Sequence, residues 1–163
     1  MTENLQESSQ KDSIDVLIEK YFSGSEFKVI EVTKKGEKTN RIIEIFVDRN
    51  EPFFIDDIAG LNRGVNELFD NEYTENDISK MTVSSPGAEK PYRFFWQLNK
   101  HIGRTMEIMM ADETFVTGKL TGLNPEGEIL ELEIRDEKKK SVIHTTQVAF
   151  KDISEIKAKL LFK

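Results

Sequence analysis

Hydrophobic residues in the first part of the chain follow helical spacing and then strand-like alternation. Five apolar residues recur at intervals of three and four and predict an amphipathic helix: Ile14, Leu17, Ile18, Tyr21 and Phe22. Ser13 is suited to cap the start of this helix, and Gly24 is suited to end it. Residues 27–33 and 41–48 are rich in β-branched side chains, so they predict two strands, joined by a turn at the polar residues 34–37.

A second helix and a third strand follow. The apolar positions of this helix are Ile58, Leu61, Val65, Leu68 and Phe69. Asp56 and Asp57 stand in its first turn, where carboxylates complement the helix dipole. Met81 and Val83 mark the third strand. Because apolar residues occupy both alternating sets of positions in 41–48, we expect both faces of that strand to be covered.

Short alternating segments dominate the rest of the chain. Residues 94–102 are aromatic and apolar, so they predict a short helix that ends at Gly103 and packs between or under the domains. Alternation beyond it predicts four strands, around residues 106–110, 116–122, 130–134 and 142–150, and then a helical turn and a last strand within 152–161. Gly118 and Gly122 stand where a strand must bend, which favours a small closed barrel.

These elements predict an α+β protein of two small domains. The N-terminal domain, residues 13–87, has the order α-β-β-α-β, with helices packed on a small sheet. The C-terminal domain, residues 94–163, is the small β-barrel, and residues 88–93 form the hinge between the two. Residues 1–12 are polar and lack periodicity, which predicts a flexible tail.

Charge is distributed unevenly between the two halves. The net charge of the chain is −7, yet residues 1–91 carry 11 Lys and Arg against 19 Asp and Glu, and residues 92–163 carry 12 against 11. The acidic first half repels a phosphate backbone and suits a basic protein partner, whereas the balanced second half is the expected side for RNA. An acidic surface also favours solubility, so this pattern alone leaves both explanations open.

Composition limits the classes of protein and site. The sequence contains no cysteine, which excludes disulfides and thiolate metal sites. No apolar run approaches the roughly 20 residues that span a bilayer. Residues 1–13 are polar and do not resemble a secretory signal. We therefore expect a cytoplasmic protein that makes no membrane contact.

Residues 84–87 are the first candidate site. Pro86 fixes φ, and Gly87 can adopt a positive φ, so Ser84, Ser85, Pro86 and Gly87 predict a sharp turn. One interpretation is a rigid hinge that sets the orientation of the domains and offers hydroxyl and backbone N–H groups to a phosphate. The other is a plain turn without a ligand.

Lys138, Lys139 and Lys140 are the second candidate site. They lie between two predicted barrel strands, where they form either a phosphate-contacting loop or a solubilising hairpin turn. His101 and His144 are the only histidines, and they lack the paired spacing of a metal or catalytic site. We assign them structural or surface roles.

Other chemistry finds little support in the sequence. Asp48, Asp56 and Asp57 could bind a hard cation, but their spacing is not that of an EF-hand, and dipole complementation explains the last two. The sequence has no glycine-rich phosphate loop and no nucleophile elbow. Trp96 and its phenylalanine neighbours could stack bases, although packing is favoured. We predict no metal, no cofactor and no catalytic residue.

The hinge carries a family resemblance. Val83-Ser84-Ser85-Pro86-Gly87, with Pro91 four residues on, resembles the hinge signature of the bacterial ribosome maturation factor RimP family. The strand end at Val47-Asp48, the helix start at Ile55-Asp56-Asp57 and the segment 117–122 are similar to that family in the same order. Lys90 stands where the family usually has arginine, so a bidentate contact is not available there.

The resemblance implies a ribosome maturation factor required for assembly of the small (30S) ribosomal subunit. It implies an SH3-like or Sm-like C-terminal barrel and no catalysis. The implied partners are the free immature subunit, a basic small-subunit ribosomal protein near the decoding region, and rRNA. The candidate contact residues are those at the hinge, Lys90 and the lysine triplet 138–140, and we expect a monomer.

Two alternatives remain open. The chain could be a general RNA-binding module of the Sm-like barrel type, in which case the barrel itself would bind RNA with a strong salt dependence. It could also be a small enzyme with an unrecognised site, which would need convergent titratable groups in a pocket.

Overall fold

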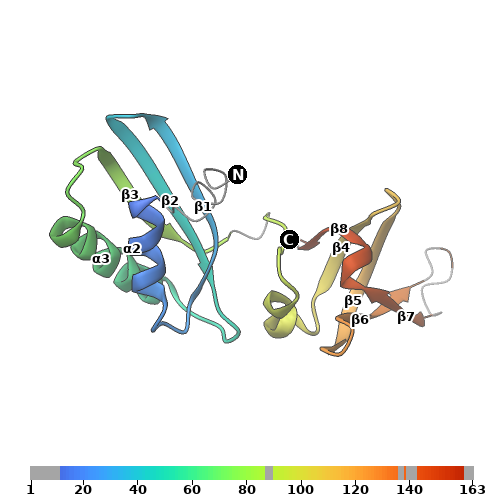
Figure 1. Ribbon diagram of the computed structural model, residues 1–163. Coiled ribbons are helices and arrows are strands. Elements are labelled where there is room, and N and C mark those ends of the chain that lie inside the picture. The colour runs from blue at the N-terminus through green and yellow to red at the C-terminus, as the bar shows by residue number, and fades with distance from the viewer. Residues whose placement is uncertain (1–11, 87–89, 136–137, 139–142, 160–163) are drawn as a thin grey trace, which may run out of the picture. The chain divides into compact units, whose positions relative to one another are not determined.

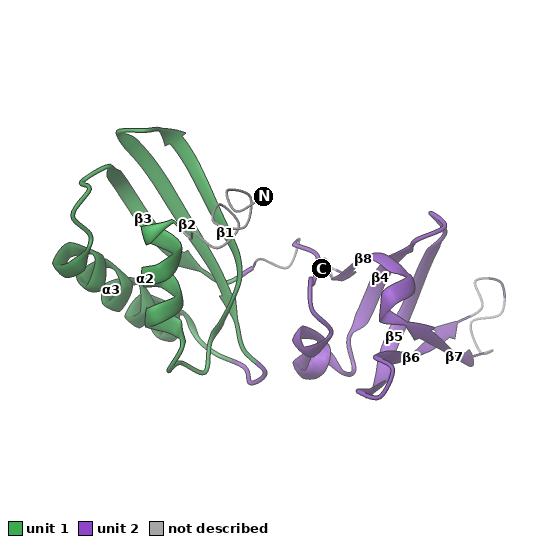
Figure 2. Ribbon diagram, viewed as in Figure 1, with its two compact units in different colours: residues 1–49, 53–85 green, residues 50–52, 86–163 purple. Residues whose placement is uncertain are grey.

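The structure is a computed structural model that describes residues 12–86, 90–135, 138 and 143–159 (Figure 1). The chain divides into two compact units (Figure 2), here called unit 1 (residues 1–49 and 53–85) and unit 2 (residues 50–52 and 86–163). The predicted tail lies outside the described residues except for Asp12, and so do Gly87 and hinge residues 88 and 89. No helix in the described part of the chain is long and apolar enough to cross a membrane.

Unit 1 is a three-stranded sheet with two helices on one face. Its elements are α2 (Ser13–Phe22), β1 (Lys28–Glu37), β2 (Asn40–Asp48), α3 (Ile55–Glu72) and β3 (Ile78–Ser84). The strand order is β1-β2-β3, with β1 antiparallel and β3 parallel to the central strand. The parallel pair is possible because α3 carries the chain back along the sheet between β2 and β3 (Figure 1).

The core of unit 1 lies between the helices and one face of β2. Ile43, Ile45 and Val47 are all 0% exposed and pack against the buried side chains of α2 and α3. Each such burial contributes about 1.5–3 kcal/mol. Ile42, on the opposite face, is 44% exposed. The expectation that both faces are covered is therefore wrong at Ile42, because both helices of the unit pack on the same side.

Two local predictions in unit 1 also need correction. The first helix is capped by Asp12, whose Oδ1 accepts a hydrogen bond from the N–H of Ile14 at 3.1 Å, and not by Ser13. The hairpin turn does not lie at residues 34–37, because β1 continues to Glu37, which pairs with Asn40. Gly36 makes this tight end possible: its φ is +91°, and a Cβ there would collide with the carbonyl oxygen of Asn40.

Unit 2 is rich in β-structure. Its elements are the 3₁₀ helix η1 (Phe95–His101), β4 (Thr105–Met110), β5 (Phe115–Asn124), β6 (Ile129–Arg135), β7 (Ile143–Ala149), the 3₁₀ turn η2 (Phe150–Asp152) and β8 (Ile153–Ala158). All pairs in the five-stranded sheet are antiparallel, in the order β7-β6-β5-β4-β8. The pairing of β5 shifts between Leu120 and Gly122, beside a glycine where the sequence predicts a bend. The predicted α+β class is confirmed.

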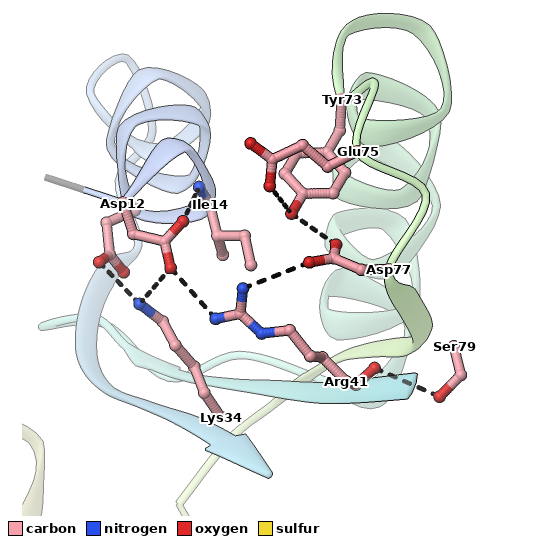
Figure 3. Close-up of polar contacts among 9 residues, drawn as sticks. Asp12, Ile14, Lys34, Arg41, Tyr73, Glu75, Asp77 and Ser79 are labelled. Carbon is pink, nitrogen blue, oxygen red and sulfur yellow. Dashed lines mark hydrogen bonds and ion pairs between the residues drawn. The ribbon is translucent and has the colours of Figure 1, made fainter. Parts of the chain in front are cut away.

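A network of ion pairs closes one end of unit 1 (Figure 3). Arg41 on β2 lies at its centre, with Nη2 3.1 Å from Oδ2 of Asp12 and Nη1 3.6 Å from Oδ2 of Asp77. The hydroxyl of Tyr73 donates to Oδ1 of Asp77 at 2.6 Å. Lys34 on β1 adds an ion pair to Asp12 at 3.5 Å. The network thus connects the start of α2 to both ends of the α3–β3 connection.

The network changes the acidity of two of its members. Burial alone would raise the pKa of Asp12, but the hydrogen bonds from Ile14 and Arg41 and the nearby charge of Lys34 outweigh it and hold the pKa below its usual value. Burial raises the pKa of Tyr73, and its hydrogen bonds to Asp77 and Glu75 raise it further. Both shifts favour the protonation states that the network needs at neutral pH.

We predict that Asp12→Asn weakens the dependence of the free energy of unfolding on pH in the acid range. Asparagine keeps the cap of α2 but loses the charge that Arg41 and Lys34 attract. A lowered folded-state pKa contributes stability above the unfolded value of about 3.9, and this contribution is lost as pH falls through the folded value. The loss at pH 7 should stay near or below about 1 kcal/mol, because the pair is partly exposed.

Urea unfolding from pH 7 to pH 2 measures this effect. Asp70→Asn, which removes an exposed carboxylate of α3, is the matched control and should leave this dependence unchanged. An Asp12→Asn profile parallel to that of the wild type would show that these ion pairs do not contribute.

Candidate binding site at the start of α3

Two asparagines of α3 complete the hydrogen bonding of the outer edge of β3. The side-chain Oδ1 of Asn62 accepts from the N–H of Val83 at 2.7 Å, and its Nδ2 donates to the carbonyl of Val83 at 2.7 Å. One turn later, Nδ2 of Asn66 donates to the carbonyl of Met81 at 3.2 Å. These bonds satisfy backbone groups that an edge strand otherwise exposes. They also attach α3 to the strand that leads directly into Ser84 and Ser85.

The side chain of the N-cap residue does not cap the start of α3. Phe54 is the N-cap residue, and phenylalanine offers no acceptor there. The carboxylate of Asp57 accepts from the N–H of Phe54 at 2.9 Å and completes the cap from within the helix. The guanidinium of Arg49 lies 3.9 Å from the same carboxylate. The side chains of Phe54 and Ile55 extend into solvent and are 79% and 86% exposed.

A pocket of about 310 Å³ lies beside these two side chains. Its lining comes from the residues before α3, the first turns of α3 and the end of β3: Phe53, Phe54, Ile55, Ile58, Val83, Ser84 and Ser85. None of these side chains titrates near neutral pH, so the pocket offers apolar contact and two hydroxyl groups. We call the surface formed by Phe54, Ile55, Ile58, Ser84 and Ser85 the α3-start patch.

Two carboxylates stand beside the α3-start patch. Asp56 is exposed and Asp57 is partly exposed, both in the first turn of α3. Arg49, which pairs with Asp57, is largely covered: its guanidinium lies 4.8 Å from the ring centre of Phe27, and it pairs with Glu26 at 3.5 Å. Asp56 thus contributes an exposed negative charge at the patch.

The structure brings some of the predicted site residues together and leaves others apart. Ser84 and Ser85 line the pocket, and Pro86, which is half-buried, follows them in the sequence and belongs to unit 2. Lys90 is half-buried in unit 2, and Lys138 is exposed in the segment between β6 and β7. Gly87, Lys139 and Lys140 lie outside the described residues.

The candidate metal and histidine residues do not form a site in the described part of the chain. No group of three or more His, Cys, Asp or Glu side chains there could hold a metal ion. Asp48 is 2% exposed, and its Oδ1 accepts from the N–H of Arg49 at 2.9 Å. The ring of His101 lies 4.9 Å from that of Tyr92, and His144 is exposed on β7. These contacts are structural in kind.

The aromatic residues at the start of unit 2 divide into two groups. Phe95 is 8% exposed and meets Phe150 edge to face at 5.9 Å, in the core of the unit. Phe94 is 40% exposed, and its ring lies nearly parallel to that of Trp96, 6.2 Å away. Phe94 thus lies outside the buried core of unit 2, whereas Phe95 belongs to it. Gln97, which is 1% exposed, caps η1 by accepting from the N–H of Phe94 at 2.9 Å.

Comparison with models of protein families identifies a domain similar to unit 1. Residues 17–89 match the model of the RimP N-terminal domain. Residues 17–89 are thus similar to a RimP N-terminal domain. This match supports the resemblance predicted from the hinge, and it runs from α2 to the residues that follow β3. The α3-start patch lies wholly within the matched residues.

One similar solved structure is described as "Structural basis of the Dcp1:Dcp2 mRNA decapping complex activation by Edc3 and Scd6". The identity is 19% and the TM-score is 0.30, and the match covers 36% of this chain and 42% of that chain. A similarity of this size does not establish a shared fold.

We predict that Asn62→Ala destabilises unit 1 by about 1–3 kcal/mol, because it leaves the N–H and carbonyl of Val83 without their partner. Asn62→Asp should be at least as damaging at pH 7, since a carboxylate faces the carbonyl of Val83. Hydrogen exchange of the Val83 amide measures the effect directly. Asn71→Ala, an exposed position on the same helix, controls for helix propensity. Equal protection of Val83 in all three variants would contradict the assignment.

Proposed function

We propose that this protein is a ribosome maturation factor that assists assembly of the small (30S) ribosomal subunit. It binds the free immature subunit through contacts with ribosomal protein, with rRNA, or with both, and it does so in the cytoplasm as a monomer. The observation that carries the proposal is the match of residues 17–89 to the RimP N-terminal domain.

The distribution of charge supports different partners for the two halves of the chain. Residues 1–91 have a net charge of −8, from 11 Lys and Arg against 19 Asp and Glu, which favours a basic protein partner. Residues 92–163 have a net charge of +1, from 12 against 11, so they repel rRNA far less. In this proposal the first half engages a basic ribosomal protein near the decoding region, and the second half contacts rRNA or the same protein.

We also propose that unit 2 is a small barrel of the SH3-like or Sm-like type. The edge strands of its sheet are β7 and β8, and only the three residues of η2 separate them in the sequence. A connection of three residues spans roughly 10 Å. Neighbouring ends of the two edge strands must therefore lie close, as they do when a sheet curls toward closure.

We propose that the protein acts without catalysis and without a cofactor. Supporting this, the pocket at the start of α3 is lined by apolar side chains and two serines, which suit binding better than proton transfer. An assembly factor of this kind acts through its contacts with the immature particle.

A second candidate function is that of a general RNA-binding module. The segment 90–106 carries Lys90, Arg93, Lys100 and Arg104 and no acidic residue, and it presents the parallel rings of Phe94 and Trp96. Cations interleaved with aromatic rings are typical of surfaces that bind single-stranded RNA.

The proposed function predicts cosedimentation with free small subunits. In a sucrose gradient at low salt, the full-length protein should migrate with purified free small subunits and not with intact ribosomes. Retention should fall as salt rises, because charge contributes to the contact. The absence of retention by free small subunits at low salt would refute the assembly role.

The alternative predicts binding to RNA alone. Titration of the full-length protein with deproteinised small-subunit rRNA should then give a steep dependence of the binding constant on salt. The fluorescence of Trp96, the only tryptophan, should change if bases stack on it. Tight binding to unrelated RNA with equal affinity would favour the general module over the assembly factor.

A further inference from the structure

We infer that the α3-start patch is a docking surface for a basic, extended protein segment of the small subunit, with an apolar side chain of that segment seated in the pocket. This inference names the contact surface of the proposed function and rests on it. It assigns a role to Phe54 and Ile55, which sequence analysis did not select as site residues.

The exposure of Phe54 is the first argument. An N-cap position favours serine, threonine, aspartate or asparagine, yet a phenylalanine occupies it and is 79% exposed. The cap is supplied by Asp57, so the phenylalanine ring contributes nothing to it. A local preference that is broken without a structural gain is expected at a functional position.

The shape of the surface is the second argument. Phe54 and Ile55 are adjacent, both are more than three-quarters exposed, and both border the pocket of about 310 Å³. Aromatic and aliphatic anchors beside a pocket are typical of the residues that dominate the energetics of protein interfaces. Ser84 and Ser85, which also line the pocket, can exchange hydrogen bonds with an extended backbone.

Charge identifies the partner. Asp56 and Asp57 stand in the first turn of α3 at the border of the patch, in a half of the chain that carries 11 Lys and Arg against 19 Asp and Glu. Arg49 pairs with Asp57 and Glu26 and stacks on Phe27, so Asp56 is the exposed charge. Such a border attracts lysine- and arginine-rich segments and repels a phosphate backbone. It also disfavours a second copy of the same acidic surface.

The patch is held in place before any partner arrives. Asn62 and Asn66 attach α3 to β3, so the two walls of the pocket are joined by hydrogen bonds of 2.7 to 3.2 Å. A surface that is already ordered loses little conformational entropy on binding. The site is thus suited to capture a flexible basic tail or loop.

A photo-cross-linking amino acid at position 54 tests the inference. The full-length protein carrying p-benzoylphenylalanine there is mixed with purified free small subunits, irradiated and analysed by mass spectrometry. Position 115 is the matched control, because Phe115 on β5 is 78% exposed. We expect a protein cross-link from position 54, on a lysine- and arginine-rich segment, and none to that segment from position 115.

Other cross-links from position 54 would overturn the inference. A cross-link to rRNA would show a nucleic-acid surface. A cross-link within residues 86–163 of the same chain, or to a second copy, would show that the patch is covered by the protein itself. The same product from both positions would show that exposure alone explains the capture.

Affinity gives a second, independent measurement. The double variant Phe54→Ser, Ile55→Ser should bind free small subunits at least tenfold more weakly than wild type, and Phe115→Ser should bind as wild type does. Serine is a good N-cap residue, so the fold of unit 1 should persist, which thermal unfolding verifies. Asp56→Lys should weaken binding further and reduce its salt dependence.

The outcomes separate the two levels of the proposal. If the wild-type protein does not bind free small subunits, the proposed function fails. If the wild type binds and the double variant binds equally well, the assembly role stands and the docking surface is refuted.

Discussion

The hydrogen bonds between Asn62 and Val83 are the constraint on which the rest of unit 1 depends. They place both an acceptor and a donor of α3 against the two free backbone groups of an edge strand, at 2.7 Å each. The fully buried Ile45 of β2 pairs with Val83 in the ladder, so helix, edge strand and central strand are held at one point. The position of the pocket and of Ser84 follows from that point. The same bonds occupy the edge of β3, so a partner cannot extend the sheet there and must be recognised by side chains.

Much of the fold could be predicted because periodicity reports burial directly. The alternation of Ile43, Ile45 and Val47 and the helical spacing of Val65 and Phe69 identify the core of unit 1 correctly. The same alternation could not show which face of β2 the helices leave open, since Ile42 is as apolar as its buried neighbours. The alternation shows which residues of β2 share a face of the sheet. Which of the two faces is buried depends on where the helices pack.

The candidate site was predictable only in part. Ser84 and Ser85 were selected from the turn and the family resemblance, and they do line the pocket. Phe54 was not selected, because exposure cannot be read from an isolated phenylalanine. Asn62 and Asn66 carried a signal, two amides four residues apart beside the apolar stripe of α3, but it takes the folded edge of β3 to show what those amides bind. Side chains whose role is to satisfy a distant backbone group leave almost no trace in local sequence.

The stacked pair of Phe94 and Trp96 has a practical consequence. Trp96 is the only indole in the chain and belongs to unit 2, whereas unit 1 contains Tyr21 and Tyr73. Its emission therefore reports the environment of unit 2, while far-ultraviolet dichroism reflects both units together. Melting curves from these two signals would reveal whether the units unfold as one cooperative body or as two.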